Sequence, residues 1–117
     1  MCGLLGIVDY KKSLNASLFN EMLNSLKHRG PDDEGVEVFS LDSFSTFLGH
    51  RRLSIIDISS NGHQPMLYEH LAIIYNGEVY NFKDIRQDLI SEGYSFDSNS
   101  DTEVILKSYH FWGIDCV

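Results

Sequence analysis

The order of the expected strands and helices limits most strongly the folds open to this chain. The apolar residues 4–8 predict a short buried strand. Residues 36–48 predict two strands joined by a tight turn near Asp42 and Ser43. A further buried strand is expected over residues 71–75. Because the central two strands follow each other through a tight turn, they are expected to pair locally and antiparallel.

Apolar residues recur at helical spacing within residues 15–30, 81–93 and 100–112, which predicts three helices that follow or separate these strands. A short apolar run at residues 53–58 is left between them. The expected helix N-caps and stops are Asn15, Asn81, Ser100 or Asp101, Gly30 and Gly93. Strands that pair locally, with helices then laid on a face, favour an α+β fold over a doubly wound sheet.

Size and charge exclude several classes of protein. With 117 residues the chain suits one compact domain. Its formal net charge of −8 repels phosphate backbones, so we expect no nucleic-acid partner. No stretch reaches the apolar length of a membrane span, and residues 1–9 lack the positive region of a signal peptide. Two cysteines, Cys2 and Cys116, make no disulfide framework, which favours a reducing compartment and predicts a cytoplasmic protein.

Cys2 is the residue with the clearest chemical potential. Methionine is normally removed before a small second residue, so the mature chain can begin with Cys2. A terminal cysteine then has its own α-amine as a base beside the thiol. The alternative is that Cys2 is only a small, buried, apolar residue at the start of a strand. The position of Cys2 alone favours this alternative. Cys116 is expected to be a structural thiol.

Several short sequence blocks favour the nucleophile role of Cys2 over the buried apolar one. In chain order they are Met1-Cys2-Gly3, Gly30-Pro31-Asp32, residues 49–57 (GHRRLSIID), Gln64-Pro65-Met66, residues 75–81 (YNGEVYN) and residues 100–106 (SDTEVIL). Together they resemble the glutaminase domain of glutamine-hydrolysing asparagine synthetase. That family belongs to the class II glutamine amidotransferases, within the N-terminal-nucleophile hydrolases. The resemblance implies an αββα sandwich of antiparallel sheets, of which residues 1–117 would be a first, truncated part without the synthetase domain.

The resemblance also implies a role for individual residues. Cys2 would be the nucleophile, with Asn76 and Gly77 forming the oxyanion hole. The implied glutamine-binding residues are Arg52, Leu53, Ser54, Ile55, Ile56, Glu78 and Asp101. Arg52 would grip the α-carboxylate, for which a guanidinium is well suited, and Asp101, with Glu78 nearby, would pair with the α-ammonium.

Each of these roles has a plainer alternative. Arg52 could be a surface charge, Asp101 a helix N-cap, and Asn76-Gly77 a hairpin turn. The last is weakened because a helix start, and not a returning strand, is expected next. One departure from the family is Arg51, where a glutamate is common; we expect it at an exposed position that tolerates the change.

The implied reaction is hydrolysis of L-glutamine to glutamate and ammonia through a Cys2 thioester. Ammonia would pass to a synthetase domain of the same protein that uses ATP and magnesium to make asparagine or a related amide. The glutaminase domain itself is expected to need no metal or other cofactor, since no histidine stands at metal-ligand spacing. The alternatives are a non-catalytic glutamine-binding module or inactive fragment, and a sister enzyme such as a sugar-phosphate aminotransferase. A homodimer is a further option, since a second copy could cover apolar faces that a truncated sandwich leaves open.

Overall fold

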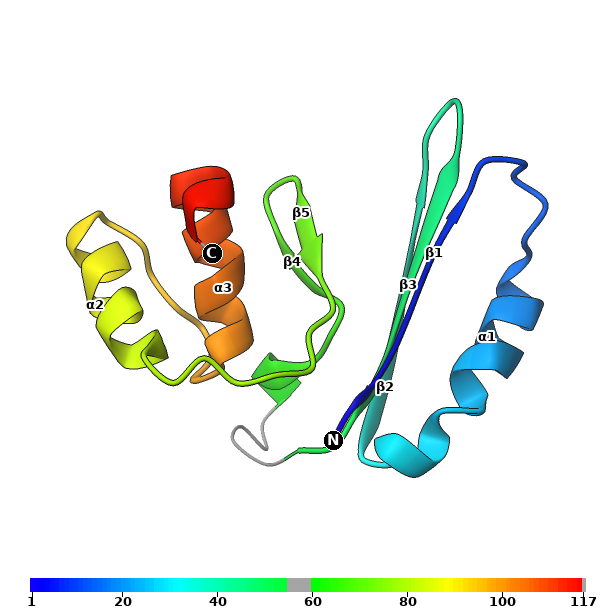
Figure 1. Ribbon diagram of the computed structural model, residues 1–117, viewed down its shortest axis with the longest axis horizontal. Helices are drawn as coiled ribbons and strands as arrows, with labels where there is room; N and C mark the ends of the chain where they lie inside the picture. Colours follow the sequence, from blue (N-terminus) through cyan, green and yellow to red (C-terminus); the bar gives the residue numbers. More distant parts are fainter. Residues whose placement is uncertain (55–59, 117) are drawn as a thin grey trace.

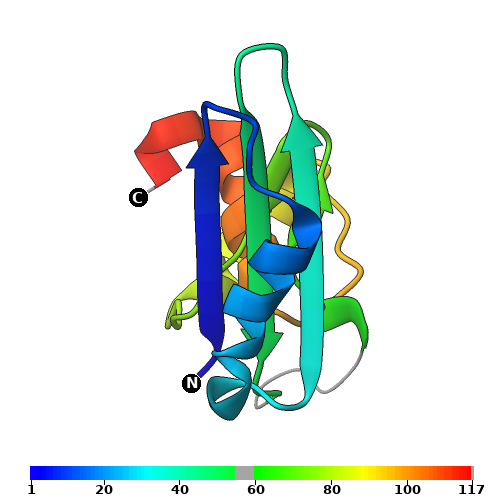
Figure 2. The same cartoon turned by 90° about the vertical axis from the view of Figure 1, so that its right-hand side faces the viewer.

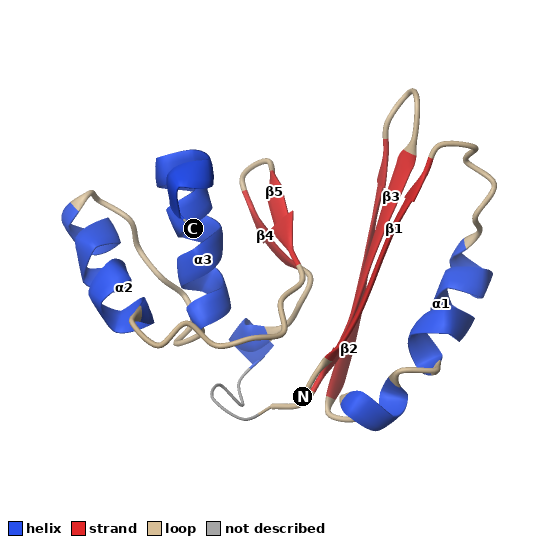
Figure 3. Ribbon diagram, in the orientation of Figure 1, coloured by secondary structure: helices blue, strands red, loops and turns tan. Residues whose placement is uncertain are grey.

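The computed structural model describes residues 1–54 and 60–116, and it has an α+β fold with antiparallel sheets (Figures 1 and 3). Its strands are β1 (Gly3–Asp9), β2 (Asp33–Ser40), β3 (Ser45–Arg52), β4 (Met66–Tyr68) and β5 (Leu71–Ile73). Its α-helices are α1 (Ala16–Asn24), α2 (Phe82–Ser91) and α3 (Asp101–Trp112), and its short 3₁₀ helices are η1 (Lys27–Arg29), η2 (Ser60–Gly62) and η3 (Gly113–Cys116).

The larger sheet has the strand order β1-β3-β2, with both pairings antiparallel. The β2-β3 hairpin confirms the two strands predicted within residues 36–48, and each extends beyond that range. Its turn lies at Asp42 and Ser43 as expected, closed by a 2.9 Å bond from the Leu41 N–H to the Phe44 carbonyl. In this register Gly3 lies opposite Arg51, so the chain start and the end of β3 meet at one edge.

Helix α1 lies across one face of this sheet, as Figure 2 shows. Phe19 and Leu23 are its buried residues, and both reach the sheet beside Gly49, where a Cβ would crowd them. The side chain of Asn15 caps the helix as predicted, accepting from the Leu18 N–H at 2.9 Å. The helix ends at Asn24, earlier than predicted, and the segment before Gly30 forms the separate helix η1.

The opposite face of the sheet looks toward the β4-β5 hairpin, against which α3 packs, with α2 beside α3 (Figure 1). The layers therefore follow the order helix, sheet, sheet, helix, which confirms the αββα arrangement. Strand β4, which has only three residues, was not predicted, and β5 ends at Ile73 instead of Tyr75. No helix of the described residues is long and apolar enough to cross a membrane.

The first strand is less buried than its apolar sequence predicts. Leu4 and Val8 are 39% and 51% exposed. They lie on the face away from α1, because Leu5 and Ile7 alternate with them and pair with the residues that α1 covers. The prediction of a fully buried strand is therefore wrong for this face, which the short β4-β5 hairpin does not cover over its whole length.

Candidate active site

A cavity of about 410 Å³ lies where the chain start, the end of β3, the segment after β5 and the start of α3 meet. Its volume falls in the range of small-molecule sites. Its walls are formed by Met1, Cys2, His50, Arg52, Leu53, Gly62, Gln64, Tyr75, Asn76, Gly77, Glu78, Ser100, Asp101 and Thr102.

The thiol of Cys2 is held by the backbone of Leu53. The Leu53 N–H donates to Cys2 Sγ at 3.3 Å, and the thiol can donate to the Leu53 carbonyl at 3.8 Å. The antiparallel pairing of β1 with β3 brings these two residues together. From η1, Arg29 Nε donates to the Cys2 carbonyl at 3.1 Å. Cys2 is thus held at both its thiol and its carbonyl.

Asn76 and Gly77 follow β5 and lie beside Cys2. The Cys2 backbone N–H donates to Asn76 Oδ1 at 3.2 Å. Because the oxygen of the amide is used in this way, its NH₂ group is the end that can donate to a ligand. The chain continues into α2 and not into a returning strand, so the hairpin-turn alternative for Asn76-Gly77 is excluded.

Opposite charges occupy different walls of the cavity. Arg52, at the end of β3, is only 8% exposed, which excludes a surface charge. On the other wall lie Asp101, which is 6% exposed, and the exposed Glu78. Burial, and then the carboxylates of Asp101 and Glu78, raise the pKa of the Tyr75 phenol above its ordinary value. The cavity thus has a cationic wall and an anionic one.

Asp101 lies in the first turn of α3, but it is not the N-cap. That position belongs to Ser100, whose hydroxyl accepts from the Thr102 N–H at 3.1 Å. Asp101 Oδ2 instead accepts from the Val79 N–H at 3.0 Å, which ties α3 to the segment that carries Asn76. The N-cap alternative for Asp101 is therefore wrong, and its carboxylate is left at the cavity wall.

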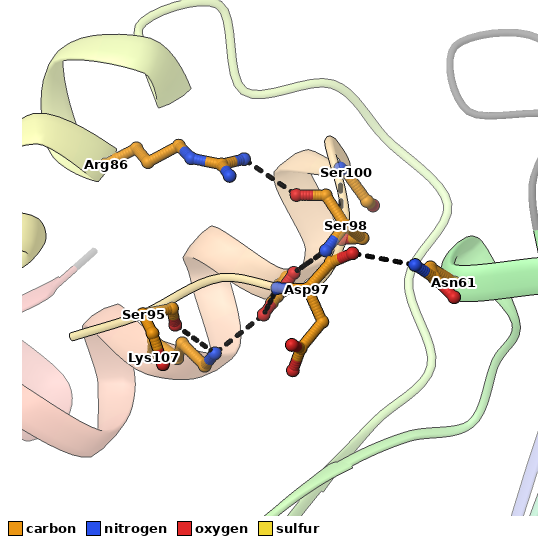
Figure 4. A network of polar contacts seen from close by, with 8 residues as sticks. Asn61, Arg86, Ser95, Asp97, Ser98, Ser100 and Lys107 are labelled. Atoms are coloured by element: carbon orange, nitrogen blue, oxygen red, sulfur yellow. Dashed lines mark hydrogen bonds and ion pairs between the residues drawn. The ribbon is translucent and has the colours of Figure 1, made fainter.

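A buried polar network fixes the loop that leads into α3 (Figure 4). Glu103 accepts from Lys107 Nζ at 2.6 Å and from the backbone N–H groups of Asp97 and Ser98 at 3.0 and 2.7 Å. Burial alone would raise the pKa of Glu103, but Lys107, Ser98 and the two backbone bonds hold it below its ordinary value. The loop is further held by Arg86, which donates to the Ser98 carbonyl at 2.8 Å.

His50 is almost fully buried, at 1% exposed, between the large sheet and the segment after β5. Burial lowers its pKa from 6.5 to about 4, against a backbone hydrogen bond at Tyr75 and the Asp33 carboxylate, which raise it. Its Nε2 is buried and makes no hydrogen bond. His50 is therefore neutral at neutral pH.

Comparisons with known proteins agree with this geometry. A family model described as a glutamine amidotransferase domain matches residues 1–117. This chain belongs to the glutamine amidotransferase domain family. It is 39% identical to a putative glutamine-hydrolysing asparagine synthetase 2 of Methanocaldococcus jannaschii, and 42% identical to a glutamine-hydrolysing asparagine synthetase 3 of Bacillus subtilis. All of this chain is matched in both cases, but it covers only 25% and 19% of those relatives.

This glutamine amidotransferase domain brings together most of the residues predicted for its site. Seven of them line one cavity, namely Cys2, Arg52, Leu53, Asn76, Gly77, Glu78 and Asp101. Ser54 is not among the lining residues; its N–H donates to Asp32 Oδ2 at 2.8 Å. Ile55 and Ile56 lie outside the described residues, as does most of the apolar run at 53–58.

The prediction that Arg51 lies at an exposed position is wrong for this domain. Arg51 is 5% exposed and lies on the α1 side of the sheet, where it pairs with the Glu34 carboxylate and donates to the side-chain oxygen of Asn24. The error has a simple cause: alternation along β3 sends Arg51 and Arg52 to opposite faces. The positive charge at position 51 is thus matched by an acidic residue of β2.

Sequence reasoning missed several residues of this cavity, above all Gln64, Thr102 and His50. All three stand in the blocks that carry the family resemblance, but nothing in their spacing indicates a cavity. They reach it through long-range pairing, which single-sequence patterns do not encode. Within the described residues, no group of three or more His, Cys, Asp or Glu side chains is placed to hold a metal ion.

Proposed function

We propose that this domain hydrolyses L-glutamine to glutamate and ammonia through a thioester on Cys2. The observation that carries the proposal is a cavity that combines a thiol, a cation, two carboxylates and the side-chain amide of Asn76. Glutamine carries an α-carboxylate, an α-ammonium and a reactive amide, and each finds a complementary group. Arg52 is assigned to the carboxylate, and Asp101 with Glu78 to the ammonium.

In the proposed reaction, Cys2 Sγ attacks the amide carbon of glutamine, and the carbonyl oxygen becomes an oxyanion. The Asn76 NH₂ group and the Gly77 N–H donate to that oxyanion, where preorganised donors stabilise most strongly. The C–N bond then breaks, and the leaving nitrogen takes the proton that came from the thiol. Water attacks the resulting thioester, which releases glutamate and restores Cys2.

The base in this scheme is the α-amine of Cys2, which exists only after Met1 is removed. Met1 is 75% exposed and lines the cavity. While Met1 is present, the nitrogen of Cys2 is a peptide amide with no basic lone pair. Removal of one exposed residue would therefore create the base and open the cavity.

We further propose that the ammonia supplies an ATP- and magnesium-dependent synthetase domain that makes asparagine or a related amide. The names of the relatives, and the short share of their length that this chain covers, support this proposal. The glutaminase step is proposed to use no metal or cofactor of its own. Cys2 and Cys116 are free thiols, which favours a reducing compartment such as the cytoplasm.

The test is production of ammonia and glutamate from glutamine by the intact protein, with the Cys2→Ala variant beside it. The proposal expects turnover by the wild type, and no turnover but continued glutamine binding by the variant. Glutamine binding without turnover by a wild type that has lost Met1 would instead support a non-catalytic glutamine-binding module.

A further inference from the structure

Gln64 is a buried cavity residue to which the proposed reaction gives no role. It lies between η2 and β4 and is 7% exposed. Its Oε1 accepts from the Tyr75 N–H at 2.6 Å, and its Nε2 donates to Thr102 Oγ1 at 3.2 Å. One side-chain amide therefore joins two segments that are distant in the sequence.

One of these segments carries the proposed oxyanion donors, and the other carries the proposed ammonium-binding carboxylate. Tyr75 directly precedes Asn76 and Gly77, and Thr102 directly follows Asp101. The β4-β5 ladder ends at the pair Met66 and Ile73, so the Tyr75 N–H takes its partner from a side chain and not from a strand.

His50 of β3, which is almost fully buried, lines the same cavity as Tyr75. The Tyr75 N–H itself is fixed by the Gln64 side chain. Because Asn76 directly follows Tyr75, fixing the Tyr75 N–H limits the positions open to Asn76.

Gln64 is itself fixed against the large sheet. Its backbone carbonyl lies so close to Gly35 of β2 that any Cβ at Gly35 would collide with it. The same sheet begins at Gly3, next to Cys2. Gln64 therefore has a fixed position relative to the thiol, to the segment with Asn76 and to the start of α3.

We propose that Gln64 is a positioning residue, which sets the spacing between the oxyanion donors at Asn76 and Gly77 and the ammonium-binding carboxylate of Asp101. The proposal rests on the glutaminase function proposed above. Gln64 acts through its neighbours, so its loss moves the donors relative to Cys2. A displacement of this kind, on the order of 1 Å, lowers rates by up to about 100-fold.

Two variants of the intact protein distinguish the contributions of the two hydrogen bonds made by the Gln64 amide. Gln64→Met keeps the length of the side chain and removes both bonds; we expect kcat for glutamine hydrolysis to fall about 10- to 100-fold and KM to rise. Thr102→Val removes only the bond toward α3, so it should raise KM and leave kcat within about twofold of the wild type.

Ser108→Ala is the matched control, because Ser108 is a buried hydroxyl of α3 that donates to the Val104 carbonyl at 2.7 Å. It should leave kcat and KM unchanged. A positioning role also makes the loss non-additive: Gln64→Met in an Asn76→Ala background should lower kcat by less than about threefold, because the donor it positions is already gone. If Gln64 had only a structural role, the loss of kcat in the double variant would be the product of the losses in the two single variants.

The outcomes separate this proposal from the proposed function. Absence of glutamine hydrolysis by the wild type contradicts the function, and full kcat in Asn76→Ala contradicts the oxyanion assignment of Asn76. With those two results as expected, full kcat in Gln64→Met, or multiplied losses in the double variant, overturns the positioning role. If Gln64→Met does not fold by circular dichroism, Thr102→Val decides, and an unchanged KM overturns the proposal.

Discussion

The backbone nitrogen of Cys2 donates to Asn76 Oδ1 across 3.2 Å, although the two residues are 74 positions apart. This contact orients the Asn76 amide, because its oxygen faces the chain start and its NH₂ group remains as the donor. The same nitrogen would become the catalytic α-amine once Met1 is removed. Asn76 therefore connects the proposed base with the proposed oxyanion hole.

The first prediction is that glutaminase activity requires a free Cys2 α-amine. The change is an N-terminal extension that a specific protease removes directly before Cys2. The extended protein should be inactive, because its Cys2 nitrogen is a peptide amide, and cleavage should restore ammonia release. Intact mass measured beside the glutaminase assay checks this. Full activity of the extended protein, with no processed species in the mass spectrum, would contradict it.

The second prediction divides the work of Asn76 and Arg52. Asn76→Ala should lower kcat by roughly 10²- to 10³-fold, the usual effect of losing one oxyanion donor. Arg52→Ala should act mainly on KM, because the carboxylate is gripped in the ground state and the transition state alike. Steady-state kinetics of the two variants checks both effects. An Asn76→Ala variant altered only in KM would rule out the oxyanion assignment.

The third prediction concerns the buried imidazole of His50. Its pKa falls from 6.5 to about 4 on folding, so below pH 6.5 the unfolded chain binds a proton that the folded chain does not. The free energy of unfolding should therefore decrease as pH falls from 6.5 toward 4. Between pH 7 and pH 5 the contribution of His50 is about 2 kcal/mol.

The matched variant for this test is His50→Gln, which has no group that titrates in this range. Urea denaturation at pH 7 and pH 5 gives the loss of stability for each protein. The wild type should lose about 2 kcal/mol more than the variant. Equal losses in the two proteins would show that His50 is not the group responsible.

The fourth prediction concerns the buried ion pair of Glu103 and Lys107, whose side chains are 7% and 5% exposed. Glu103→Gln leaves the Lys107 ammonium buried without its partner, which should destabilise the fold by about 3–5 kcal/mol. Replacing Lys107 by Met in the same protein removes that charge and should recover part of the loss. Urea midpoints of the single and double variants check this, and a wild-type midpoint for Glu103→Gln would refute it.

Local patterns predicted much of this fold, because helix caps and tight turns depend on residues close in sequence. Asn15 and the turn at Asp42 and Ser43 are of this kind. Asn81 does lie before α2, but its side chain makes no capping bond. The positions of the strands near β4 and β5 were predicted less well, since three-residue strands have no clear period.

The charged residues show the limit of sequence reasoning more clearly. Arg51 and Arg52 are neighbours in sequence and face opposite sides of β3, which only the strand register reveals. Asp101 and Ser100 both suit a helix N-cap, and the structure assigns that position to Ser100. Gln64 gave no local signal, because both of its partners are distant in the sequence.

The most direct test of the central claim is covalent labelling with a glutamine analogue that carries a diazoketone in place of the amide. The processed protein is incubated with the analogue, and its peptides are mapped by mass spectrometry while ammonia release from glutamine is followed. The account predicts one label on Cys2, none on Cys116, and loss of activity in proportion to labelling, with excess glutamine slowing both. Labelling of Cys116, or full activity in protein fully labelled at Cys2, would contradict Cys2 as the nucleophile.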